Sequence, residues 1–188
     1  IDFVAMSFVR DASHLHQLRE ELADIGCHAR IVAKIEDQQA VRHLDEIIEA
    51  ADVVIIGVKP AMVTDVLREI SDSLSADALI ISVAAGVTTA TMESVVANPV
   101  VRAMPNTPAL IGKGVTGIAA GSRATAAHLA AARSVFEVVG WALELPESQI
   151  DALSTISGSG PAYVFHAMEQ WTVAAVELGF SDGATTSF

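Results

Sequence analysis

Three apolar stretches of the sequence end in residues that are either small or able to bind a ligand. The stretches lie at 52–58, 79–83 and 99–103, and each has the composition of a parallel strand that is covered on both faces. The candidate ligand-binding residues are Gly57, Val58, Lys59 and Pro60 in the first stretch and just after it, Val83, Ala84 and Ala85 at the end of the second, and Asn106 after the third.

The chemistry of these residues suits a small, flat ligand. Lys59 supplies a cation, Asn106 supplies a paired hydrogen-bond donor and acceptor, and the small residues let a ligand approach the backbone. Open α/β sheets bind ligands beyond the carboxyl ends of their strands. We therefore expect a small-molecule site where these three turns meet, although each turn taken singly is explained equally well as a tight connection from a strand to a helix.

Other chemistries find little support in the sequence. The pattern G-x-G-x-x-G occurs once, at Gly112–Gly117, but no helix follows it, so we expect a hairpin there and not a phosphate cradle. The six histidines are scattered, with His14 and His16 facing different directions on a predicted helix, and we expect no metal site. Cys27 follows the carboxyl end of that helix, where the helix dipole disfavours a thiolate.

Composition and charge exclude several classes of partner. The 188 residues are 52% hydrophobic and 18% charged, which is typical of a globular protein. A net charge of −12 argues against broad binding to nucleic acids or anionic membranes, and no apolar run is long enough to span a bilayer. The single cysteine fits a reducing compartment, so we expect a cytoplasmic protein.

Strand patterns alternate with helix patterns along most of the chain. Strands are predicted at 1–6, 7–10, 30–33, 52–58, 79–83, 99–103, 115–119 and 141–145, and the main helices at 13–25, 41–48, 60–74 and 125–139. This alternation predicts an α/β domain with a mainly parallel sheet.

The segment 153–179 has a different pattern. Ser157-Gly158-Ser159-Gly160 predicts a flexible hinge, Pro161 suits the first turn of a helix, and Gly179 suits its end. The predicted helix at 162–178 is apolar over most of its circumference, with His166, Glu169, Gln170 and Glu177 in one narrow polar stripe. Such a helix must be buried on several sides, so we expect a domain junction or a subunit interface; an ordinary core helix is the alternative.

Four motifs in this order and spacing resemble the pyrroline-5-carboxylate reductase family. They are Val58-Lys59-Pro60, Ser82-Val-Ala-Ala-Gly86, Val101-Arg-Ala-Met-Pro-Asn-Thr-Pro108 and Ser157-Gly-Ser-Gly-Pro-Ala-Tyr163. The resemblance implies reduction of 1-pyrroline-5-carboxylate to L-proline with NADPH or NADH. It also implies a Rossmann-type dinucleotide-binding domain at 1–150, the beginning of an all-α dimerisation domain at 151–188, and a homodimer or higher homo-oligomer.

The resemblance also assigns roles to the candidate residues. Lys59, Pro60, Ala84, Ala85 and Asn106 would line the nicotinamide and its ribose. Ser157, Gly158, Ser159, Gly160 and Pro161 would lie near the substrate. No side chain is assigned a proton-transfer role, because a protonated cyclic imine is already an electrophile and catalysis is largely a matter of positioning.

Two departures from the family pattern leave alternatives open. The family opens with a strand and a glycine-rich turn; Ile1–Met6 would be the remnant of that strand, and the turn is missing. The family's later loop Ser-Pro-Gly-Gly-Thr-Thr is not recognisable either. The alternatives are another Rossmann-domain dehydrogenase acting on hydroxy acids, and a non-catalytic homologue that retains only the dimer interface. The first would usually carry a lysine on the long helix, and 162–178 has none.

The cofactor preference rests on Arg10, at the end of the predicted strand 7–10. A guanidinium at this place can hold the 2′-phosphate of NADPH, whereas NAD-binding domains usually carry an acidic residue there. Asp11 is adjacent, but neighbouring side chains of an extended chain project to opposite faces. We therefore predict that Arg10 contacts the cofactor and that NADPH is preferred over NADH.

Overall fold

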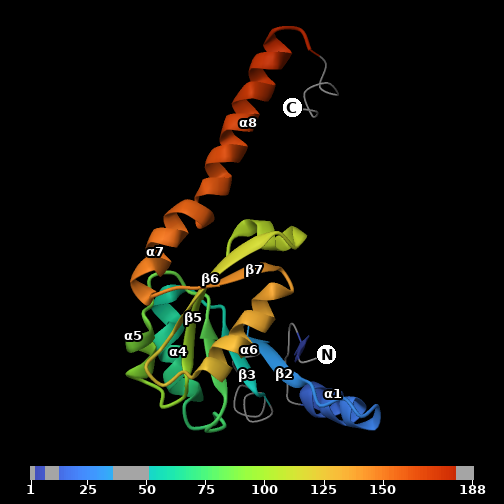
Figure 1. Cartoon of the computed structure of the whole chain (residues 1–188), viewed down its shortest axis with the longest axis vertical. Coiled ribbons are helices and arrows are strands. Elements are labelled where there is room, and N and C mark those ends of the chain that lie inside the picture. The colour runs from blue at the N-terminus through green and yellow to red at the C-terminus, as the bar shows by residue number, and fades with distance from the viewer. Residues whose placement is uncertain (1–2, 7–12, 36–50, 181–188) are drawn as a thin grey trace.

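The computed structural model describes residues 3–6, 13–35 and 51–180 of the chain (Figure 1). It contains a seven-stranded sheet in the order β1-β2-β3-β4-β5-β6-β7. The strands are β1 (Phe3–Met6), β2 (Arg30–Ile35), β3 (Val53–Ile56), β4 (Leu79–Ser82), β5 (Val100–Met104), β6 (Gly114–Ala120) and β7 (Gly140–Glu144). All adjacent pairs are parallel except β5 with β6, so the predicted α/β fold with a mainly parallel, Rossmann-like sheet is confirmed.

The described helices connect the strands and then continue beyond the sheet. The α-helices are α1 (Ser13–Asp24), α4 (Val63–Ile70), α5 (Thr89–Glu93), α6 (Ala126–Glu137), α7 (Ile150–Leu153) and α8 (Gly160–Glu177). Three short 3₁₀ helices lie at Pro60–Met62, Thr107–Ile111 and Glu147–Gln149, and a π-helical turn lies at Ser154–Gly158. None of the helices in the described ranges is long and apolar enough to cross a membrane.

Two hydrophobic clusters cover the two faces of the sheet. Val54, Ile56 and Ile80 point to the cluster that includes α1, α4 and α5. Val53 and Ile81, which are neighbours of those residues along the same strands, point to the cluster that includes Phe136 and other α6 residues. Both faces are therefore buried, which explains why β3 and β4 are apolar without alternation.

The order of the first strands differs from the one the family pattern implies. In a dinucleotide-binding fold of strand order 3-2-1-4, the first strand pairs with the fourth. Here β1 pairs with β2, and β2 pairs with β3 along Val32↔Val53 to Ile35↔Ile56. The interpretation of Ile1–Met6 as the central strand of such a fold is therefore wrong, because β2 occupies the place next to β3.

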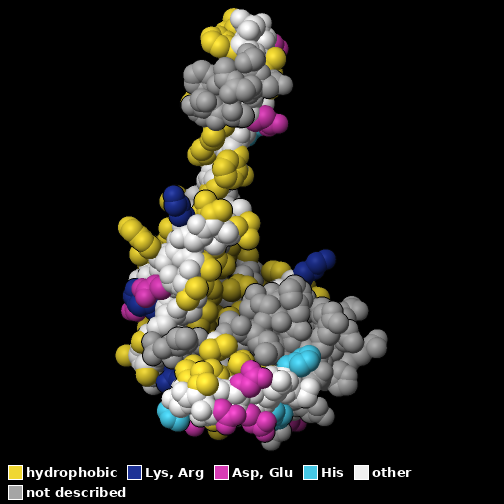
Figure 2. Space-filling view, turned by 90° about the vertical axis from the view of Figure 1, so that its right-hand side faces the viewer, with side chains coloured by type: hydrophobic (Ala, Val, Ile, Leu, Met, Phe, Trp, Pro, Cys, Tyr) yellow, Lys and Arg dark blue, Asp and Glu magenta, His cyan; other side chains and the backbone are white. Residues whose placement is uncertain are grey.

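The long helix α8 projects away from the sheet domain (Figure 1). It has no buried residue, and its exposed apolar side chains include Tyr163, Phe165 and Trp171, with Trp171 69% exposed. Figure 2 shows hydrophobic side chains along the narrow arm. The predicted extent of the helix is confirmed, and a single copy of the chain leaves its apolar circumference uncovered.

The predicted break before this helix is itself helical. The chain passes from α7 through the π-helical turn Ser154–Gly158 into α8, with Ser159 between them. Side chains reinforce the turn: the Thr155 hydroxyl donates to the Ala152 carbonyl at 2.7 Å, and the Ser157 hydroxyl donates to the Leu153 carbonyl at 3.1 Å. Bonds of this kind, from a hydroxyl to a carbonyl of the preceding turn, are common where a helix bends, and the backbone here stays helical through Gly158 instead of forming the predicted hinge.

Candidate functional site

The carboxyl ends of β3, β4 and β5 lie side by side. Ile56 is aligned with Ser82, and Ser82 with Arg102, across the three parallel strands. The backbone N–H of Val83 donates to the Ile56 carbonyl at 3.2 Å, which continues the pairing just past β4. The turns that follow these strands therefore meet at one edge of the sheet, as the sequence predicted.

The turn after β3 presents a free cation at this edge. Gly57, Lys59 and Pro60 are exposed, whereas Val58 packs against the core. Pro60 opens the 3₁₀ helix with Lys59 as its N-cap residue. No carboxylate in the described ranges pairs with Lys59, so its ammonium group is available to an anionic or polar ligand.

The turn after β4 offers open backbone. The buried Ser82 hydroxyl accepts a hydrogen bond from the Ala84 N–H at 3.3 Å, which fixes the start of the turn, while Val83 is half-buried and Ala84 is buried. Ala85 and Gly86 are exposed, and Gly86 has a φ of +74° with no atom within 4 Å of the place where a Cβ would lie. A flat ligand could therefore reach the backbone here without meeting a side chain.

Asn106, beyond β5, joins the two groups of residues that the sequence singled out. Its side-chain oxygen accepts from the Val115 N–H at 2.8 Å, and its amide nitrogen donates to the Ser157 carbonyl at 3.0 Å. The second bond brings the π-helical turn to the edge of the sheet. The amide of Asn106 thus holds protein groups in this structure, and its contribution at the edge is to fasten Ser157 there.

The residues predicted to lie near the substrate occupy the start of the helical arm. Ser157, Gly158, Ser159, Gly160 and Pro161 are all half-buried, unlike the exposed residues that follow them. A Cβ at Gly160 would meet nothing within 4 Å, and one at Gly158 would lie 3.3 Å from the Ser154 hydroxyl oxygen. The backbone of Gly160 is therefore not covered by a neighbouring side chain.

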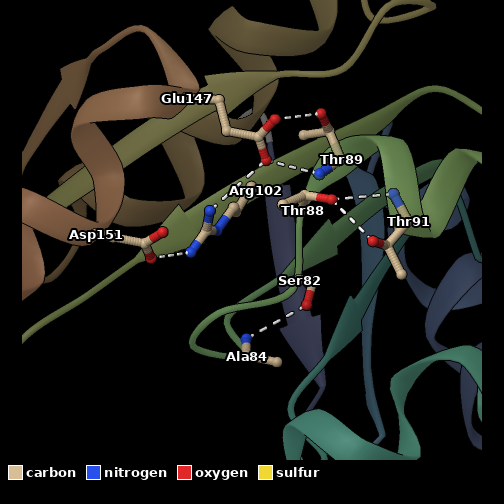
Figure 3. Close-up of polar contacts among 8 residues, drawn as sticks. All are labelled: Ser82, Ala84, Thr88, Thr89, Thr91, Arg102, Glu147 and Asp151. Carbon is tan, nitrogen blue, oxygen red and sulfur yellow. Dashed lines mark hydrogen bonds and ion pairs between the residues drawn. The ribbon is translucent and has the colours of Figure 1, made fainter.

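A buried arginine, which the sequence reading passed over, connects the same elements (Figure 3). Arg102 on β5 is 1% exposed; its Nη2 lies 2.5 Å from Asp151 Oδ1 and its Nη1 lies 3.7 Å from Glu147 Oε1. Glu147 in turn accepts from the Thr89 N–H at 2.6 Å and from the Thr89 hydroxyl at 2.7 Å. The signal for this network was an arginine within an otherwise apolar strand, a residue that requires a buried partner.

The remaining predictions have different outcomes. Arg10 lies outside the described residues, so its place relative to the sheet edge stays a prediction. Gly112–Gly117 is confirmed as part of a hairpin: Gly112 ends a 3₁₀ helix with a φ of +70°, and Gly114 begins β6, which is antiparallel to β5. Among the residues that the structure describes, no group of histidine, cysteine and acidic side chains could hold a metal ion.

A cavity of about 370 Å³ lies at the opposite edge of the sheet. It is lined by the residues at the amino ends of β2, β3 and β4, among them Arg30, Val53 and Leu79, together with Arg19 and Asp52, which pair at 3.3 Å. Ligand sites of open α/β sheets lie at the carboxyl ends of the strands. We therefore place the candidate site at the Lys59, Ala85 and Asn106 edge, where the surface is open and not enclosed.

A nicotinamide dinucleotide fits one half of this edge. The open turn at Ala85 and Gly86 and the free Lys59 suit the nicotinamide and its ribose. The pyrophosphate normally rests on a glycine-rich turn at a helix N-terminus. The first 56 residues contain one glycine, Gly26, which follows the carboxyl end of α1 and not the end of a strand.

Fold and site together define an α/β protein of the Rossmann-like class, with a ligand edge that is joined to a projecting helical arm. The comparisons make this class more specific. The family model "Pyrroline-5-carboxylate reductase dimerisation" matches residues 147–188. The chain is similar to the pyrroline-5-carboxylate reductase of Pseudomonas aeruginosa, with 41% identity over 165 residues that cover 85% of this chain and 60% of the relative.

Solved structures agree with this assignment. A pyrroline-5-carboxylate reductase from Coxiella burnetii matches with a TM-score of 0.72 and 30% identity, covering 93% of this chain and 72% of that one. The NADP-bound pyrroline carboxylate reductase of Plasmodium falciparum matches with a TM-score of 0.74 and 27% identity, covering 84% and 62%. The chain belongs to the pyrroline-5-carboxylate reductase family, and it spans 60% or less of the length of the Pseudomonas aeruginosa and Mycobacterium tuberculosis relatives.

A second family matches the beginning of the chain. The model "Pyruvate kinase, barrel domain" covers residues 1–103, so this part of the chain also belongs to the pyruvate kinase barrel family. In a barrel, consecutive parallel strands are neighbours in the sheet, and β1 to β5 follow that order here. The order of β1 to β5 is the same as that of consecutive strands in a barrel, in the part of the chain that this model matches.

Proposed function

We propose that the protein reduces 1-pyrroline-5-carboxylate to L-proline with a reduced nicotinamide cofactor. The observation that supports the proposal is the bond from Asn106 to the Ser157 carbonyl, which joins one of the residues assigned to the substrate to a residue assigned to the nicotinamide. The cofactor-binding residues of this proposal are Gly57, Val58, Lys59, Pro60, Val83, Ala84, Ala85, Asn106 and, outside the described ranges, Arg10. The substrate-binding residues are Ser157–Pro161.

The chain's contribution to the reaction is to position the reactants. When bound, the reduced nicotinamide supplies a hydride to the carbon of the protonated C=N bond. The exposed backbone of Ala85 and Gly86 receives the flat ring, and Lys59 holds polar groups of the ribose. The half-buried turn Ser157–Gly160 presents its backbone to the substrate. In well-oriented reactions, such positioning lowers the activation free energy by up to about 7–11 kcal/mol.

We further propose that residues 1–150 form the cofactor-binding domain and that residues 151–188 begin a helical domain that pairs with a second copy. The 18-residue helix α8 has no buried side chain in one copy, and the dimerisation model covers it. A homodimer, or a larger assembly of such dimers, would cover Phe165, Trp171 and their apolar neighbours. NADPH is the proposed cofactor, on the strength of Arg10 and of the NADP-bound structural relative.

A non-catalytic role is the second candidate, favoured by a specific observation. The first 103 residues match the pyruvate kinase barrel, and residues 1–52 contain no glycine-rich turn that could receive a pyrophosphate. A protein of this kind would retain the dimer interface without reducing the imine.

One assay separates the two candidates. The purified protein is given 1-pyrroline-5-carboxylate with NADPH or NADH, and cofactor oxidation is followed by absorbance, while binding of each cofactor is measured by calorimetry. Turnover with proline as product supports the reductase. Dimers that neither bind nor oxidise either cofactor would establish the non-catalytic alternative.

A further inference from the structure

Arg102 connects the two halves of the candidate site, which are the turn Ala84–Gly86 after β4 and the π-helical turn at Ser157. Its side chain is buried beneath the sheet edge, and its strand β5 pairs with β4 through Ser82↔Arg102. Removing a guanidinium from water is costly unless oppositely charged partners compensate it. The position of those partners is therefore tied to the position of the strand.

Both partners come from the segment between β7 and α8. Glu147 lies in the 3₁₀ helix that follows β7, and Asp151 lies in α7. The two Nη atoms contact the two carboxylates, whereas Nε has no acceptor among the described protein groups. The orientation of the guanidinium is thus determined by Glu147 and Asp151, and this side chain is one of the contacts that hold α7 against the sheet.

The contacts extend from Glu147 to the turn after β4. Both carboxylate oxygens of Glu147 accept hydrogen bonds from Thr89, at 2.6 Å from its N–H and at 2.7 Å from its hydroxyl. Thr89 begins α5, three residues after Gly86, and Thr88 caps that helix by accepting from the Thr91 N–H at 3.1 Å. Figure 3 shows the contacts from Thr89 through Glu147 and Arg102 to Asp151, with the Ser82–Ala84 bond of the preceding turn as a separate contact.

The contacts through Asp151 reach the other half of the site. α7 runs directly into the π-helical turn Ser154–Gly158, and Asn106 on the same side of β5 holds the Ser157 carbonyl. π-helical turns within helices are frequent at functional sites. Arg102 and Asn106, four residues apart in the sequence, therefore hold α7 and the π turn at two points.

We propose that Arg102 is a positioning residue, which sets the π turn at Ser157 against the Ala84–Gly86 turn through Asp151 and Glu147. The inference rests on the proposed reductase function, because it assigns the substrate to one turn and the nicotinamide to the other. Arg102 itself is too deeply buried to touch either reactant. Its effect is on the distance between them, and a misplacement of about 1 Å can lower a rate by about 100-fold.

The test uses Asp151→Asn, because the Asp151 side chain is 70% exposed and the substitution is therefore tolerated by the fold. The neutral amide of the asparagine removes one carboxylate and leaves Glu147 to compensate the buried charge of Arg102. Asp151→Glu is the matched control that restores a carboxylate. Spin labels at Ala90→Cys on α5 and Gln170→Cys on α8, in a Cys27→Ser background and diluted with unlabelled protein, report the distance between the two halves within one copy.

Asp151→Asn should broaden the distribution of distances and lower kcat by about 10- to 100-fold, with KM for both reactants within about a factor of two. Asp151→Glu should restore the narrow distribution and most of the rate. A distribution that stays narrow in Asp151→Asn would overturn the proposal, whatever the rate. Failure of the unaltered protein to turn over would reject the proposed function, and the distances alone would then decide the role of Arg102.

Discussion

The side-chain amide of Asn106 bridges two backbones, accepting from the Val115 N–H and donating to the Ser157 carbonyl 51 residues further along the chain. This bridge is one of the contacts by which the sheet edge holds the beginning of the helical arm. Because the bridge lies between the proposed cofactor turns and the proposed substrate turn, a substitution of Asn106 tests whether these turns form one site.

Asn106→Ala should therefore reduce both stability and activity. It removes two hydrogen bonds in a partly buried place and leaves two backbone groups without partners, so the free energy of unfolding should fall by about 1–3 kcal/mol. Urea denaturation measures this loss, and steady-state kinetics should show a lower kcat.

Asn98→Ala is the matched control for that substitution. Asn98 also donates two hydrogen bonds from its amide, to the Ser75 and Ala78 carbonyls, but it lies away from the candidate site. The control should lose similar stability and retain its kinetic constants. Equal kinetic effects of the two variants would show that Asn106 has no particular role at the site.

The arm helix gives a prediction about assembly. Trp171→Glu places a charge on the apolar side of α8, and an unpaired charge in an interface costs several kcal/mol, so the variant should dissociate to monomers at micromolar concentration. Light scattering measures the change. Because Trp171 is 69% exposed in a single copy, the fold of each monomer should be unaffected.

Gln170→Glu provides the comparison for the assembly prediction. It adds the same charge at the residue before Trp171, on the polar stripe with Glu169 and Glu177. This variant should assemble as the unaltered protein does. If both variants behave alike, or if the unaltered protein is monomeric, α8 is not the interface.

The sequence predicted the part of the fold whose signals are local. β3 and β4 were recognisable because each is a short apolar run that ends at small residues, and α8 because Pro161 and Gly179 mark its ends. The π-helical turn was missed because its stability comes partly from Asn106, which is remote in sequence, whereas Ser157–Gly160 alone favours a break.

The common location of the candidate turns was predicted for the same reason. The turns at Lys59 and Ala85 follow directly from the strand patterns, but the partners of Arg102 lie 45 and 49 residues away. No periodicity connects such positions. The place of β2 beside β3 could not be read from local pattern either, because strand order depends on connections and not on composition.

Arg10 gives a prediction that rests on the sequence alone. If its guanidinium holds the 2′-phosphate of NADPH, Arg10→Ala should raise KM for NADPH by about tenfold, which is the loss expected for a charge-assisted pair, and leave KM for NADH nearly unchanged. Initial rates with each cofactor provide the measurement. Asp11→Ala, at the neighbouring residue, is the control and should not raise KM for NADPH. Equal effects of Arg10→Ala on both cofactors would show that Arg10 does not bind the 2′-phosphate.

Gly117 on β6 tests how closely α7 must pack against the sheet. A Cβ at this position would lie 2.5 Å from Leu153 Cδ2 and 3.1 Å from Ile150 Cδ1, both on α7. Gly117→Ala should displace the Leu153 and Ile150 side chains, and because Ile150 is buried it should destabilise the protein by about 1–3 kcal/mol, the usual cost of overpacking. Gly160→Ala is the opposite case, because a Cβ there meets nothing within 4 Å, and it should leave stability unchanged or raise it by up to about 1 kcal/mol. Thermal unfolding of the two variants compares them directly. If Gly117→Ala were as stable as the unaltered protein, the side chains of α7 would have room to move, and the helix would not be held rigidly against β6.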